Sequence, residues 1–206
     1  MKSVRTYKLE SCVTSLEEAI YAQKHGADRV ELCANLASDG MTPLYHLVSV
    51  ACDRLKIPTR VMIRATKEGF EVDTHQLVEM IRAINEFKHL PIEGFVLGVM
   101  KDRRVDRHAM TELLHHVTPF PVTFHKAIDL SEDMASDIDW LNQQPGIDTI
   151  LTSGGAEHAV EGIPNILAMK SRFRGSIMAA GKIKPQDIEA LDNELQLPWY
   201  HGSAIV

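Results

Sequence analysis

Six side chains with acid–base or anion-binding chemistry stand at the ends of short apolar runs in this sequence. They are Glu10, Glu31, Arg64, His125, Asp129 and His201. A histidine exchanges protons near neutral pH, a carboxylate can orient it, and a guanidinium can hold an anion. If these side chains share one pocket, the sequence predicts proton transfer next to a carbonyl group, with His125 as the general acid or base. The alternative is a layer of ion pairs that only stabilises the fold, because structural ion pairs also perturb ionisation.

Two cysteines follow the first two apolar runs at matching positions. Cys12 and Cys33 could both face one opening, and two thiolates on adjacent strands can bind a soft ion such as Cu(I). The alternative is that both pack as small hydrophobic side chains, since free cysteine is among the most buried residue types. Cys52 falls within an expected helix and is predicted to be core. The sequence has no CxxC or HExxH pattern of the kind that indicates a zinc site.

Glycine and serine end several of the same runs and suggest a place for an anionic ligand or cofactor. The candidates are Ser153, Gly154, Gly181, Gly202 and Ser203. Exposed backbone N–H groups in such loops often bind phosphate, especially next to the start of a helix. Glycine is also the ordinary residue for ending a strand tightly, so the loops alone leave both interpretations open.

Short apolar runs alternate with amphipathic segments along the whole chain, a pattern typical of repeated strand–helix units. The expected strands are 7–11, 29–33, 59–64, 94–100, 121–125, 149–152, 176–180 and 199–201. Helix-start signals follow the first seven: Ser15 with Glu18, Thr42 with Pro43, Asp73 with Gln76, Asp106, Ser131, Pro164 and Pro185. Strict alternation requires a parallel sheet, because each helix must return the chain across the sheet.

Eight such strands close naturally into a barrel. We therefore predict an α/β fold over residues 1–206 as a single domain: a TIM-barrel-like (β/α)8 barrel of parallel strands, with the final helix short or missing. The alternative is an open doubly wound sheet, which commonly uses about five or six strands. Chemistry in a barrel belongs at the C-terminal ends of the strands. Side-chain alternation predicts inward-facing residues at Glu10, Glu31, Cys33, Thr123 and His125, and closure places His201 beside Glu10.

The composition limits the classes of partner. The chain has 22 Lys+Arg and 28 Asp+Glu, a formal net charge of −6, which does not favour nucleic acid or an anionic membrane surface. No apolar run approaches the ~20 residues that a membrane-spanning helix needs. The charged segment 1–8 lacks the apolar stretch of a signal peptide, and three sparse cysteines indicate reduced thiols. We expect a soluble cytoplasmic protein without nucleic-acid or membrane partners.

Five short strings occur in an order and spacing that match a known protein family. They are GADRVELCA at 26–34, MTP at 41–43, MIR at 62–64, VTFHKAID at 122–129 and LTSG at 151–154. From about Leu9 to Ser203 the chain resembles the CutC family. The resemblance implies a TIM-barrel-like fold, a cytoplasmic location, a role in copper homeostasis with copper binding, and a homo-oligomer such as a dimer.

The resemblance also assigns family positions to residues of this chain. The family's cysteines fall on Cys12 and Cys33, and its strand-end polar residues fall on Glu10, Glu31, Arg64 and His125. One motif departs from the pattern: the family's Arg-Pro-Arg-Gly-Gly is here Arg-Ala-Thr-Lys-Glu-Gly at 64–69. The second arginine is missing, and Lys67 offers a point charge rather than a bidentate fork.

Three hypotheses for function follow. In the first, Cys12 and Cys33 bind Cu(I), with Glu10 or His201 nearby. In the second, the protein is an isomerase- or lyase-like enzyme on a small anionic, optionally phosphorylated metabolite, held by Arg64 and the glycine loops. In the third, the barrel acts through its surface as a regulatory or assembly subunit. The residues leave open whether the protein is an enzyme.

Overall fold

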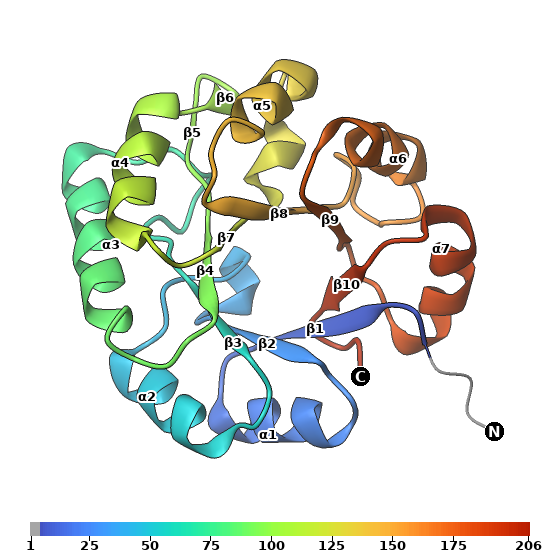
Figure 1. Ribbon diagram of the computed structural model, residues 1–206, viewed down its shortest axis with the longest axis horizontal. Coiled ribbons are helices and arrows are strands. Elements are labelled where there is room, and N and C mark those ends of the chain that lie inside the picture. Colours follow the sequence, from blue (N-terminus) through green and yellow to red (C-terminus); the bar gives the residue numbers. More distant parts are fainter. Residues whose placement is uncertain (1–4) are drawn as a thin grey trace.

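Parallel strands close into one eight-stranded barrel in the structure, a computed structural model that describes residues 5–206 (Figure 1). The strands, in their order around the barrel, are β1 (Lys8–Val13), β10 (Trp199–Gly202), β9 (Ser176–Ala179), β8 (Ile147–Thr152), β7 (Val122–Phe124), β4 (Gly94–Leu97), β3 (Thr59–Met62) and β2 (Arg29–Leu32). Closure pairs β1 with β10, so that Glu10 lies opposite His201. The predicted TIM-barrel-like fold is confirmed.

Helices connect successive strands and surround the barrel in Figure 1. They are α1 (Leu16–Lys24), α2 (Tyr45–Arg54), α3 (Thr74–Phe87), α4 (Arg107–Val117), α5 (Met134–Leu141), α6 (Ile163–Arg172) and α7 (Ile188–Leu195). The loops also contain smaller elements. These are the 3-10 helices η1 (Leu36–Ser38), η2 (Lys126–Leu130) and η3 (Pro185–Asp187), and the hairpin of β5 (Met100–Lys101) with β6 (Arg104–Val105). Among the described residues no helix follows β10, and the C-terminal end lies between α7 and α1 in Figure 1.

Three helix-start predictions based on side-chain capping are confirmed. Asp73 and Gln76 form a complete capping box at the start of α3, and Asp106 caps α4. Ser15 accepts a hydrogen bond from the Glu18 backbone N–H at 3.1 Å, which satisfies one free donor of α1. Within residues 5–206, no helix is long and apolar enough to cross a membrane.

Two other helix-start predictions are wrong. Thr42 does not cap α2: its hydroxyl accepts from the Arg64 N–H at 2.8 Å and donates to the Arg64 carbonyl at 3.0 Å, which fastens the loop to the end of β3. The helix begins at Tyr45, and the residue before it, Leu44, is 79% exposed. Ser131 ends η2, and Asp133 caps α5 instead.

Side-chain alternation along the strands separates two layers. Leu9, Val30, Leu32 and Phe124 belong to the apolar core between the strands and the helices. The residues adjacent to them in sequence, Glu10, Glu31 and Thr123, point to the barrel axis, where their side chains are fully buried. The barrel interior of this protein therefore holds buried charges as well as small apolar clusters, and these charges must be compensated internally.

Candidate functional site

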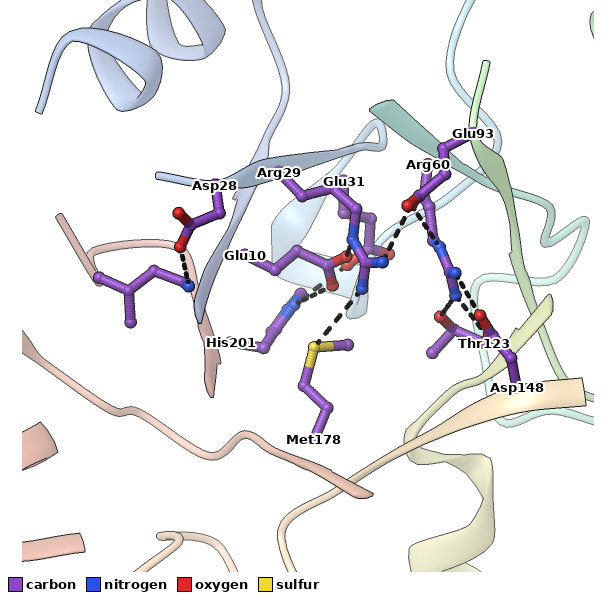
Figure 2. Close-up of polar contacts among 11 residues, drawn as sticks. Glu10, Asp28, Arg29, Glu31, Arg60, Glu93, Thr123, Asp148, Met178 and His201 are labelled. Atoms are coloured by element: carbon purple, nitrogen blue, oxygen red, sulfur yellow. Dashed lines mark hydrogen bonds and ion pairs between the residues drawn. The ribbon is translucent and has the colours of Figure 1, made fainter. Parts of the chain in front are cut away.

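A layer of buried ion pairs fills the barrel toward the N-terminal ends of the strands (Figure 2). Arg29 and Arg60 are each 2% exposed in their side chains, and both donate to Glu93 Oε2 at 2.9 Å. Arg60 also donates to the two oxygens of Asp148 at 2.9 and 2.6 Å, and to the hydroxyl of Thr123 at 2.5 Å. These groups satisfy one another and do not line the cavity described below, so this layer is structural.

A carboxylate–histidine–carboxylate chain connects that layer to the mouth of the barrel (Figure 2). Arg29 Nε donates to Glu10 Oε2 at 2.5 Å, and Glu10 Oε1 lies 2.9 Å from His201 Nδ1. The other imidazole nitrogen, His201 Nε2, lies 3.4 Å from Glu31 Oε2. The structure therefore brings together Glu10, Glu31 and His201, as the barrel prediction requires.

The two carboxyl groups of this chain have opposite ionisation behaviour. Burial alone would raise the pKa of Glu10, but the Arg29 charge and the His201 hydrogen bond outweigh it and lower that pKa to about 2. Burial raises the pKa of Glu31 to about 8, with the Glu10 charge adding to the effect and the His201 charge opposing it. Burial lowers the pKa of His201, but the Glu10 hydrogen bond and the charges of the two carboxylates outweigh it, so the pKa of His201 is raised overall. A proton is therefore available between Glu31 and His201 at neutral pH.

The two strand-end cysteines meet beside this chain. Cys12 Sγ and Cys33 Sγ are 3.2 Å apart, and both thiols are free. The hydrogen bond with Cys33, followed by burial and the Glu31 charge, raises the pKa of Cys12 well above its ordinary value. Ligand atoms of Cys12, Glu31 and His201 all lie within 4.8 Å of one another. Sulfur, imidazole nitrogen and carboxylate oxygen thus converge as a possible metal-binding group.

A cavity of about 560 Å³ opens at the C-terminal ends of the strands. Its more buried lining residues are Cys12, Glu31, Met62, His125, Leu151, Ala180, Ile183 and His201, and its outer ones include Asp39, Lys126, Glu157, Lys182 and Lys184. Gly181, Gly202 and Ser203 also line it, as predicted for the loops after β9 and β10. Cys33 lies behind Cys12, in a small buried cluster with Met62 and Val96.

Arg64 lies outside the lining of the cavity, so its guanidinium is not placed to hold an anion there. Its guanidinium donates to the backbone carbonyls of Ser38, Gly40, Lys67 and Gly69 and packs 4.5 Å from the centre of the Phe70 ring. The arginine thereby ties the loop after β2 to the loop after β3. Its two terminal nitrogens donate to these carbonyls, whereas its buried Nε has no hydrogen-bond partner among residues 5–206.

Asp129, Ser153 and Gly154 also lie outside the cavity lining. The Asp129 carboxylate accepts hydrogen bonds from the hydroxyl of Thr152, from the backbone and hydroxyl of Ser153, and from the Gly155 N–H. A Cβ on Gly154 would lie 2.4 Å from a backbone carbonyl oxygen, so this glycine allows two loops to approach closely. These three residues organise the loop after β8 rather than a ligand.

Arg29 keeps the Glu10 carboxylate ionised, but it is not among the candidate site residues predicted from the sequence, which lie at the ends of strands. It begins β2 rather than ending it. The signal that could have found it is side-chain alternation, because Arg29 is two positions before Glu31 and must share its inward side. A positive charge was needed there to compensate the buried carboxylates.

The fold and the site define a TIM-barrel protein with a polar mouth, a thiol pair and a carboxylate–histidine chain. Comparison with known proteins identifies the family: a model of the CutC family matches residues 7–206, and the chain belongs to that family. CutC of Pasteurella multocida is 37% identical over 187 residues, which are 89% of this chain and 76% of that protein. The human copper homeostasis protein cutC homolog is 31% identical over 201 residues, or 96% of this chain and 73% of the human one.

Solved structures agree with this assignment. The crystal structure of a CutC protein from Streptococcus agalactiae superposes with a TM-score of 0.92 at 29% identity, covering 97% of this chain and 100% of that one. A phosphoribosylanthranilate isomerase of Thermotoga maritima superposes with a TM-score of 0.61 at 14% identity, covering 95% and 86%. That second likeness shows the shared barrel fold alone.

Proposed function

We propose that this protein handles copper by binding Cu(I) at the mouth of the barrel, through Cys12 and Cys33. The observation that supports this most directly is the 3.2 Å separation of the two sulfur atoms from neighbouring strands. Thiolates are the ligands that Cu(I) prefers, and the name of the human relative refers to copper homeostasis. His201 Nε2 and Glu31 lie within reach as further donors. Binding releases protons, because both thiols must ionise to become ligands.

Titration of the reduced protein with Cu(I) against a competing chelator tests this proposal. The Cys12→Ser/Cys33→Ser variant should bind Cu(I) at least tenfold more weakly, since hydroxyl oxygen is a poor ligand for a soft ion. Cys52→Ser is the matched control, because that thiol is in α2 and outside the cavity lining. Wild-type affinity in the double variant would exclude this site.

A second candidate function, an isomerase- or lyase-like enzyme on a small anionic metabolite in the same mouth, is favoured by the cavity volume. About 560 Å³ falls in the range of small-molecule sites, roughly 300–1,000 Å³, and far exceeds the space that one ion occupies. Glu31 and His201, whose Oε2 and Nε2 atoms are 3.4 Å apart, would exchange the proton with the substrate.

The cytoplasmic location and the homo-oligomer, such as a dimer, remain predictions that rest on the family resemblance.

Thermal unfolding in the presence of small organic acids and phosphates tests the second candidate. A ligand at about 100 times its Kd adds about 2.7 kcal/mol to the free energy of unfolding, which corresponds to a Tm rise of roughly 5–10 °C for a chain of this size. Glu31→Gln should reduce turnover of such a ligand without abolishing its binding. If no compound of either class raises the Tm, the enzyme proposal loses its support.

A further inference from the structure

His125 presents a buried hydrogen-bond donor without a partner. Its Nδ1 accepts from the Ala127 backbone N–H at 3.3 Å, which places the ring hydrogen on Nε2. Nε2 is buried and has no partner among the described residues, although His125 lines the cavity. Leaving a buried donor unpaired costs about 1–3 kcal/mol, so a persistent one calls for an explanation.

The surroundings of the ring keep this donor in place and keep it neutral. Gly98 leaves room for the imidazole, because a Cβ there would lie 2.8 Å from His125 Nδ1. The Phe70 ring centre is 4.8 Å away on another side. Burial, followed by the Arg64 charge, lowers the pKa of His125 to about 3. The group is therefore a neutral N–H donor at physiological pH and not the general base that its residue type suggests.

The buried wall of the cavity carries no lysine or arginine, whereas its outer edge carries three lysines. The two arginines nearby already have partners: Arg64 donates to loop carbonyls, and Arg29 donates to Glu10 and Glu93. The outer edge carries Lys126, Lys182 and Lys184. Lys182 pairs with Glu157, whereas Lys126 and Lys184 have no ion-pair partner within residues 5–206.

From this division we infer that the mouth binds a short carbonyl compound that also carries an anionic group, such as an oxo acid. The carbonyl oxygen accepts the free hydrogen bond of His125 Nε2–H at the buried wall. The anionic group faces Lys126 and Lys184 at the outer edge. The inference rests on the second candidate function and specifies its ligand class and orientation.

Calorimetric titration with matched pairs of acids tests the inference. The probes are 2-oxobutanoate, 4-oxopentanoate and 5-oxohexanoate, each compared with the straight-chain acid that lacks the carbonyl group. At least one oxo acid should bind wild-type protein about tenfold more tightly than its partner acid, because only the carbonyl satisfies the buried donor. His125→Phe should reduce that preference to less than twofold, and His125→Gln, which retains a donor, should restore part of it. His115→Phe, on the exposed side of α4, is the control.

The position of the anionic group is tested separately. For the pair of acids that shows the carbonyl preference, Lys126→Gln/Lys184→Gln should weaken the binding of the oxo acid and of its partner acid by a similar factor. The preference for the oxo acid should stay intact. In the NMR spectrum, the His125 Nε2–H proton should shift when the oxo acid binds and stay in place with the partner acid.

The outcomes separate this inference from the function on which it rests. If oxo acids and their partner acids bind equally well, or if His125→Phe retains the tenfold preference, the inference is wrong while a small-molecule site survives. If none of the six acids binds, the inference is overturned, and the thermal screen with phosphates then decides the second candidate function independently.

Discussion

Replacing Arg29 with methionine should lower the free energy of unfolding by about 3–5 kcal/mol. The Arg29 guanidinium is the main charge that keeps the Glu10 carboxylate ionised, and the Glu10 side chain is fully buried. Without Arg29, Glu10 becomes either an unpaired buried charge or a protonated acid with a raised pKa, and both states cost stability. Urea unfolding at pH 7 measures the change. His201 should also lose its fixed orientation, because Glu10 is its Nδ1 partner.

Arg5→Met is the matched control for this prediction. Arg5 pairs with Asp28 at 2.7 Å, but the two side chains are 34% and 33% exposed, so the loss should be at most about 1 kcal/mol. Adding Glu10→Leu to Arg29→Met should recover much of the stability, because an apolar replacement of a buried pair is often neutral. If Arg29→Met costs no more than Arg5→Met, the buried pair does not have the role assigned to it. The double variant keeps the test informative if Arg29→Met does not fold.

The sequence predicts correctly those features that depend on periodicity and closure. Alternation along β1 and β2 places Glu10 and Glu31 inward, and closing the barrel between β1 and β10 brings His201 to Glu10. The register of β1 with β2 pairs Cys12 with Glu31 and leaves the sulfur of Cys33 next to that of Cys12. Each of these neighbours follows from strand geometry alone, so no knowledge of the loops is needed.

The features that the sequence misses depend on how loops fold back on the strand ends. Arg64 follows β3, but its partners are carbonyls of two loops whose paths no local pattern predicts. Thr42 has the residue type of a helix cap and instead bonds to the backbone of Arg64. The role of His125 is similar: its residue type suggests a base, whereas burial and the Ala127 N–H make it a neutral donor.

The opposite pKa shifts of His125 and Glu31 should largely cancel each other in the free energy of unfolding between pH 7 and pH 5. The pKa of His125 is lowered from 6.5 to about 3, so the unfolded chain binds its proton first and stability falls as the pH falls below 6.5. The pKa of Glu31 is raised from 4.5 to about 8, so the folded chain holds the extra proton and stability rises as the pH falls. Each effect amounts to about 2 kcal/mol over this interval, at about 1.4 kcal/mol per pH unit.

Single substitutions should separate the two contributions. His125→Phe removes the destabilising one, so its free energy of unfolding should rise by about 2 kcal/mol relative to wild type on going from pH 7 to pH 5. The free energy of unfolding of Glu31→Gln should fall by a similar amount relative to wild type over the same pH interval. His201 is unchanged in His125→Phe, so its own titration cancels in that comparison. Urea unfolding at pH 5, 6 and 7 measures all three proteins, and parallel pH profiles for wild type and His125→Phe would show that His125 is not held neutral by burial.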